Sequence, residues 1–194
     1  MRRRSFRREL GNRRYKKLYL LATEGAKTEP QYFSMFNDER NLLKVKCIKH
    51  GDASAPKKLL ASLKKSLHEL TNNDEAWIIV DKDNWNNEQL QLLYDWSCQK
   101  KRFGFALSNP MFEYWLLLHF ENGNNIESKR ECVQKLKKHL PNYAKGKLEL
   151  NKILPGVSSA IERAKAKDSP PCQKWPTNTG TTVYRLVEKL NINK

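Results

Sequence analysis

The chain has 194 residues, enough for one α/β domain with a helical extension or for two small domains. Its 37 lysines and arginines against 21 acidic residues give a formal net charge of +16, which favours contact with a polyanion, most often a nucleic acid. The alternative is a ribosome-associated or simply basic soluble protein. No apolar stretch has the length of a membrane span, and no signal core with a cleavage site follows the basic N-terminus.

The four cysteines are widely spaced and form neither a Cys-x-x-Cys pair nor a zinc-type cluster with histidine. We therefore expect reduced thiols in a cytoplasmic protein without membrane association. The chain opens with a basic arm over residues 1–17, in which nine basic residues face one acid, for a net charge of +8. Self-repulsion predicts that this arm stays mobile until it binds an anion. A solvated tail without a role is the alternative.

The first predicted buried strand covers residues 18–22, an apolar run that ends just before Glu24. A helix is expected to follow, with Thr28 as its N-cap and Gln31 at the spacing of a capping box. Lys27 lies in the loop between the strand and the helix, where a cation can meet a phosphate. In so basic a chain, Lys27 is also readily explained as an ordinary surface residue.

The central strand is predicted over residues 77–80, after a weaker strand over 44–50 and an amphipathic helix over 57–70. Asp81 and Asp83 follow it, and side chains two apart in an extended segment point the same way. Both acids can thus face the carboxyl end of the strand, where open α/β sheets bind ligands. Such close carboxylates repel each other unless a cation, such as Mg²⁺, lies between them. The alternative is that they only cap a helix or form a turn.

A helix over 86–101 and a strand over 103–107 come next, followed by a helix over 111–120 with Asn109 as its expected cap. This last helix is apolar almost all round, so it should be buried. Within it, His119 is better interpreted as a packed core histidine than as a ligand.

Glu113 is the anomaly of that helix, because a buried carboxylate needs a cation, hydrogen-bond donors or a proton. Since it follows a strand directly, it should lie on the same rim of the sheet as Glu24 and Asp81. The alternative is a glutamate that pairs with an arginine or caps the first turn.

The remainder of the chain predicts lysine-rich helices over 127–140 and 148–165, an irregular connection over 168–176 and a helix over 182–190. The alternation of strands and helices from residue 18 to 120 predicts an α/β fold: a mainly parallel four-stranded sheet with helices on both faces. We expect three parts: the arm of 1–17, an α/β domain of 18–121, and a helical extension of 122–194 packed on it.

The chain resembles the RloB family, which includes the AbiLii-type abortive-infection proteins. The resemblance is carried by Glu-Gly-x-Lys-Thr-Glu-Pro at 24–30, Asp-x-Asp at 81–83, Ser-Asn-Pro-x-Phe-Glu at 108–113 with His-Phe at 119–120, and the segment 178–190. It implies a Toprim-like fold, in which Glu24, Asp81 and Asp83 hold Mg²⁺ or Mn²⁺. It also implies a phage-defence nuclease, often encoded beside an ATPase, that acts on RNA such as tRNA in preference to DNA. The chain is too short to hold primase or topoisomerase domains as well.

The leading hypothesis is therefore metal-dependent phosphodiester cleavage. Glu113 would complete the metal site or act as a base, and Lys27 or Lys82 would steady the phosphate charge. A second hypothesis is a non-catalytic nucleic-acid-binding or assembly subunit whose ATPase partner does the chemistry. A third, nucleotidyl transfer or nucleotide hydrolysis, is disfavoured because the chain has no Gly-rich phosphate loop.

Overall fold

The fold is described by a computed structural model that covers residues 17–37, 43–48, 56–82 and 85–192. The predictions for Asp83, for residues 1–16 of the basic arm and for the end of the strand expected over 44–50 lie outside the described residues. Lys17, which we expected in the arm, is the first residue of a strand.

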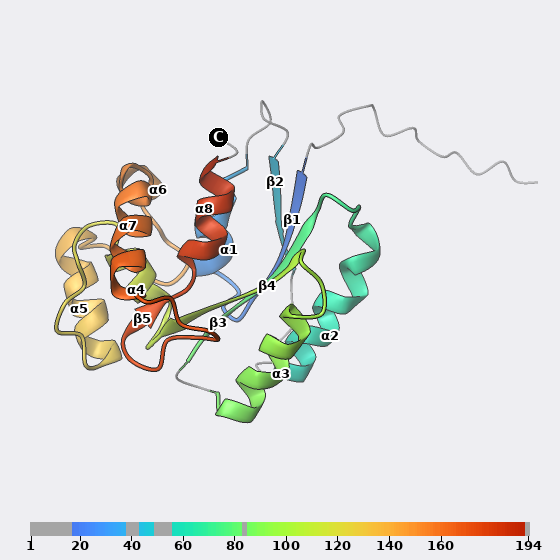
Figure 1. Ribbon diagram of the computed structural model, residues 1–194. Coiled ribbons are helices and arrows are strands. Elements are labelled where there is room, and N and C mark those ends of the chain that lie inside the picture. The colour runs from blue at the N-terminus through green and yellow to red at the C-terminus, as the bar shows by residue number, and fades with distance from the viewer. Residues whose placement is uncertain (1–16, 38–42, 49–55, 83–84, 193–194) are drawn as a thin grey trace, which may run out of the picture.

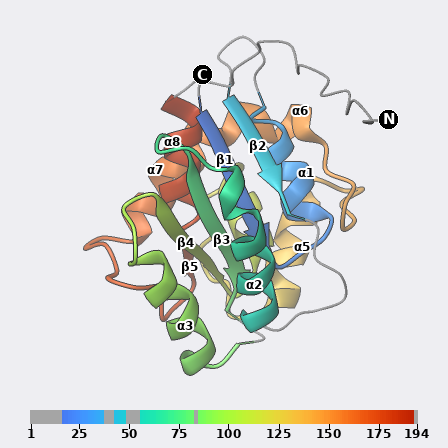
Figure 2. The ribbon, with the colours of Figure 1, turned by 90° about the vertical axis from the view of Figure 1, so that its right-hand side faces the viewer.

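The core of the fold is a mixed sheet with the strand order β2-β1-β3-β4-β5 (Figures 1 and 2). The first four strands in that order are parallel, as predicted, and β5 runs antiparallel to β4. The strands are β1 (Lys17–Thr23), β2 (Leu43–Cys47), β3 (Glu75–Asp81), β4 (Phe103–Asn109) and β5 (Gly180–Thr181). The α/β class is thus confirmed.

The expectation of four strands is wrong, because the C-terminal part of the chain adds β5 as a fifth. Thr182, directly after β5, fastens it to β4: its N–H donates to Leu107 O, and its hydroxyl oxygen accepts from Leu107 N–H, each at 2.9 Å. The buried hydroxyls of Ser108 and Thr181 lie 2.9 Å apart and complete the pairing. A strand of two residues has no hydrophobic period, so only these long-range bonds define it.

The helices connect and cover these strands. They are α1 (Thr28–Ser34), α2 (Pro56–Ser66), η1 (Leu67–Glu69), α3 (Asn87–Ser97), α4 (Phe112–Leu117), α5 (Lys129–His139), α6 (Leu150–Ile153), η2 (Leu154–Gly156), α7 (Val157–Lys167) and α8 (Tyr184–Ile192). The single helix expected over 148–165 is broken into α6, η2 and α7, because Pro155 in η2 lacks the N–H of a helix interior. No helix in the described part of the chain is long and apolar enough to cross a membrane.

The two faces of the sheet are buried by different helices, as Figure 1 shows. Alternate residues of the central strands point to opposite faces. Leu20 and Ile78 pack with α2 and α3, whereas Leu21 and Ile79 pack with α1, α4, α5, α7 and α8. The helices of 122–194 therefore share one hydrophobic core with the sheet, while the division of the chain at residue 121 stays a prediction.

Two predicted helix caps are wrong. Thr28 and Gln31 do not form a capping box, because their side chains bind the segment around residue 147: Gly146 N–H donates to Thr28 Oγ1 at 3.2 Å, and Leu148 N–H donates to Gln31 Oε1 at 2.9 Å. Asn109 does not cap α4, which begins at Phe112. Instead its amide donates to two backbone oxygens of the segment before β5. In each case a tertiary partner has replaced the local one.

Candidate functional site

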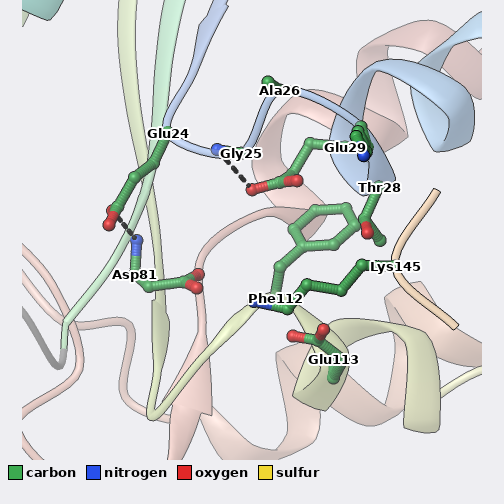
Figure 3. A pocket seen from close by; sticks show the side chains of 10 residues that line it. Glu24, Gly25, Ala26, Thr28, Glu29, Asp81, Phe112, Glu113 and Lys145 are labelled. Carbon is green, nitrogen blue, oxygen red and sulfur yellow. Dashed lines mark hydrogen bonds between the residues drawn. The ribbon is translucent and has the colours of Figure 1, made fainter. Parts of the chain in front are cut away.

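A pocket of about 490 Å³ opens at the carboxyl ends of β1, β3 and β4 (Figure 3). Glu24 and Asp81 lie side by side in it, because β1 and β3 are parallel neighbours: Glu24 N–H donates to Ile79 O at 3.0 Å, and Asp81 N–H donates to Glu24 Oε2 at 3.1 Å. The residues that line the pocket are Glu24, Gly25, Ala26, Lys27, Thr28, Glu29, Asp81, Phe112, Glu113 and Lys145.

Glu113 reaches the same pocket from the first turn of α4, directly after β4. Its side chain is buried, with 4 % of the residue exposed. The hydrogen-bond donor that such a carboxylate requires is the hydroxyl of Tyr143, 2.5 Å from Glu113 Oε1. The structure thus brings three of the four predicted acids together, and the fourth, Asp83, is outside the described residues.

Glu29 is a fourth carboxylate of the pocket that sequence reasoning missed as a site residue. It is 6 % exposed in the first turn of α1, and it accepts a hydrogen bond from Gly25 N–H at 2.9 Å. An alanine Cβ at position 25 would lie 2.0 Å from Glu29 Oε2, so the glycine is what allows the carboxylate to approach the loop. The sequence feature that could have identified Glu29 as a site residue is its position in the Glu-Gly-x-Lys-Thr-Glu motif, five residues after Glu24.

The electrostatics of the pocket disfavour its negative charge. Burial raises the pKa of Asp81 well above its usual range, and the carboxylates of Glu29, Glu24 and Glu113 raise it further, against a hydrogen bond from Phe112 N–H. Burial also raises the pKa of Glu29, although its backbone hydrogen bonds oppose this. A proton or a cation in the pocket relieves the repulsion among these acids.

Two lysines line the pocket and are otherwise exposed to solvent. Lys27 comes from the predicted strand–helix loop, and Lys145 comes from the C-terminal extension, where no motif had singled it out. Lys82 is not a lining residue, and its ammonium group lies 3.4 Å from Asn87 Oδ1.

His119 lies in the core rather than in the pocket, as predicted. Its Nδ1–H donates to Trp115 O at 3.0 Å, which leaves Nε2 to accept from the Tyr32 hydroxyl at 3.1 Å. Burial lowers its pKa to about 4, so the ring is neutral.

A family model for RloB-like proteins matches residues 19–190. The chain belongs to the RloB-like family. Searches of curated proteins and of solved structures gave no match. The matched range contains all four pocket carboxylates, Asp83 and both pocket lysines, and the family is associated with defence-type proteins in general.

The pocket of this RloB-like chain fits a hard divalent cation in its chemistry, because its acids offer only carboxylate oxygens, the donors that Mg²⁺ and Mn²⁺ prefer. In the arrangement described, however, no three His, Cys, Asp or Glu side chains among residues 17–37, 43–48, 56–82 and 85–192 are placed to hold a metal ion together. A complete coordination shell is thus not preformed by the described residues. The metal site and the Toprim-like assignment stay predictions.

Proposed function

We propose that this RloB-like protein is a metal-dependent nuclease effector of a phage-defence system, acting on RNA in preference to DNA. The observation that carries the proposal is the gathering of Glu24, Glu29, Asp81 and Glu113 in one pocket at the carboxyl ends of the parallel strands. Four acids in one partly buried pocket repel one another, which lowers the stability of the protein unless the acids bind protons or a cation. Clusters of this kind are commonly functional sites.

In the proposed mechanism, Glu24, Asp81 and Asp83 would hold Mg²⁺ or Mn²⁺, and Glu113 would complete the site or act as a base. When bound, the metal polarises a phosphoryl oxygen and lowers the pKa of a water molecule. Burial and the neighbouring acids raise the pKa of Asp81, so a bound cation would favour the ionised form of this carboxyl group. Lys27 and Lys145 lie where they can bind phosphate oxygens and offset their charge.

The rest of the chain supports a polyanionic substrate. Its net charge of +16 contrasts with the acids of the pocket, so phosphates can be attracted broadly over the surface and cleaved at one point. We further propose that residues 1–17 bind nucleic acid, that an ATPase is the protein partner, and that the complex works in the cytoplasm.

The decisive test incubates the purified protein with end-labelled tRNA, single-stranded RNA and duplex DNA, each in Mg²⁺, Mn²⁺ or EDTA. We expect cleavage of RNA that requires the metal and disappears in Asp81→Asn, with Asp95→Asn, an exposed residue of α3 outside the pocket, as the matched control. Metal-independent cleavage that persists in Asp81→Asn would contradict the proposal. Tight binding without any cleavage would favour the non-catalytic subunit.

A further inference from the structure

The segment from Tyr143 to Leu148 belongs to the C-terminal extension but forms one side of the carboxylate pocket. It is fixed to α1 at two points, through Thr28 and through Gln31, whose amide both accepts from Leu148 N–H and donates to Leu148 O. Gly146 has a φ of +77°, and an alanine Cβ there would lie 2.8 Å from Lys27 Cβ. The glycine therefore allows the segment to turn while it packs closely against the loop that precedes α1.

Tyr143 is the part of this segment that contacts an acid of the pocket. Only 8 % of the residue is exposed, and its hydroxyl donates to Glu113 Oε1 at 2.5 Å. Burial and the Glu113 carboxylate raise the pKa of Tyr143, so the hydroxyl keeps its proton and remains a donor.

A second hydroxyl contacts Tyr143 from α1. The side chain of Thr28 is hydrogen-bonded to Tyr143, and its Oγ1 accepts from Gly146 N–H. The Thr28 hydroxyl proton can be donated to Tyr143, whose own hydroxyl proton is donated to Glu113. All three residues are largely buried, which strengthens these hydrogen bonds relative to bonds at an exposed surface.

We propose that Tyr143 is a positioning residue for Glu113: it binds Oε1 and thereby leaves Oε2 as the oxygen that Glu113 offers to the reaction. This inference rests on the proposed nuclease function and deepens it, since it makes a residue of the extension part of the active site. Figure 3 shows the Glu113 carboxylate at the edge of the pocket, beside Lys145 from the same segment. A carboxylate with one oxygen anchored keeps a single orientation, as ligands and bases need.

The competing explanation is that Tyr143 only fastens the extension to α4. A purely structural bond would affect the melting temperature and leave the chemical step unchanged in the folded protein. A positioning bond would lower kcat with little change in KM, because Tyr143 does not itself contact the substrate.

The test is Tyr143→Phe, which removes the hydroxyl and keeps the ring. We expect kcat for RNA cleavage at saturating Mg²⁺ to fall about 10- to 100-fold, the usual loss for a partner that orients a catalytic carboxylate, with KM nearly unchanged. The control is Tyr114→Phe. Tyr114 is a buried tyrosine like Tyr143 but lies in α4, and its hydroxyl donates to the backbone oxygen of Gly123 at 3.3 Å rather than to a carboxylate. Its kcat should match the wild type.

A double-mutant cycle sharpens the test. Tyr143→Phe should have little further effect on kcat in a Glu113→Gln background, whereas residues without coupling give additive losses, as we expect for Tyr114→Phe with Glu113→Gln. If Tyr143→Phe does not fold at the assay temperature, Thr28→Val serves instead, since it removes the hydroxyl that contacts Tyr143, and kcat should fall, by less than the 10- to 100-fold expected for Tyr143→Phe, with KM nearly unchanged.

The outcomes separate the two proposals. A Tyr143→Phe protein with wild-type kcat, or a kcat loss shared by Tyr114→Phe, would overturn the positioning role and leave the nuclease function standing. Additive losses in the Tyr143–Glu113 cycle would do the same. A wild-type protein that cleaves no RNA or DNA under any metal condition would overturn the nuclease function, and the positioning role with it.

Discussion

Strand β3 carries one acid at each end, and the fold treats the two in opposite ways. Glu75, at the amino end, accepts from Lys17 at 2.8 Å and from Lys189 and Trp77 Nε1 at 2.9 Å each. Burial alone would raise the pKa of Glu75, but these hydrogen bonds outweigh it and lower the pKa. Asp81, at the carboxyl end, has acids as its neighbours, and its pKa is raised.

The comparison separates a structural acid from a functional candidate. Glu75 ties the C-terminal helix α8 to the start of β1 and β3 through its two lysines, so its charge is compensated within the fold. Asp81 instead lies among the carboxylates of Glu24, Glu29 and Glu113, which disfavour its negative charge. If the contrast is correct, a substitution of Asp81 should lower activity but not stability, and a substitution of Glu75 should lower stability but not activity.

The largest expected effect is on cleavage. Asp81→Asn should lower kcat for RNA cleavage by more than about 100-fold. Loss of a residue that only supports a metal ligand typically lowers activity about 10- to 100-fold, and Asp81 is itself a proposed ligand. Glu75→Gln should cleave at the wild-type rate under the same conditions. Timed gel assays at saturating RNA and Mg²⁺ would measure both, and equal losses in the two variants would remove the distinction.

The next largest effect is on stability, in the opposite order. Glu75→Gln should lower the free energy of unfolding by about 1–2 kcal/mol, because it removes charge-assisted bonds to two lysines that are themselves partly exposed. Asp81→Asn should leave the stability unchanged or raise it in EDTA. Urea titrations followed by circular dichroism give both values. A Glu75→Gln protein as stable as the wild type would show that the pairs add nothing.

The pH dependence of the two variants should have opposite signs. The raised pKa of Asp81 gives stabilisation that is complete below its unfolded value of about 4 and is lost as pH rises through the folded value. The lowered pKa of Glu75 gives stabilisation that is present above about 4 and is lost at lower pH. Between about pH 3 and pH 8 in EDTA, the melting temperature relative to wild type should rise for Asp81→Asn and fall for Glu75→Gln. Parallel trends would contradict this.

The smallest effect is the response to added cations. Mn²⁺ or Mg²⁺ should raise the melting temperature of the wild type by a few degrees, roughly 2–4 °C for each kcal/mol of binding, because the cation relieves repulsion among the pocket acids. Glu75→Gln should respond as the wild type does, and Asp81→Asn much less. Differential scanning fluorimetry measures the shift, and an equal response in all three proteins would argue against a cation at the pocket.

The sequence allowed the sheet and much of the pocket to be predicted for one physical reason. Apolar runs mark buried parallel strands, and acids placed directly after such runs must meet at one rim, which is where Glu24, Asp81 and Glu113 lie. The buried interpretation of His119 followed in the same way from an apolar helix. These inferences needed only local patterns and the rule that parallel strands end together.

The features that could not be predicted depend on distant contacts. Tyr143 meets Glu113 across thirty residues, and nothing in its neighbours marks it as the partner of a carboxylate. Thr28 has the sequence of a cap, but its hydroxyl is used by Gly146, more than a hundred residues away. The β5 strand exists only through its bonds to β4. Local propensity gave no information on any of these pairings.

The position of β2 at the end of the sheet order has a consequence for self-association. β2 pairs with β1 on one side, and on its other side the N–H of Val45 donates to Asn37 Oδ1 at 2.7 Å, so Asn37 covers part of the edge to which a strand of a second molecule could add. The strand reads Leu-Lys-Val-Lys-Cys, and Lys46 is paired with Glu69 of η1. Lysines on such an edge oppose the stacking of like strands, since each added copy would bring its own positive charges alongside. An exchange of both lysines for threonine would therefore favour aggregation at the strand farthest from β5.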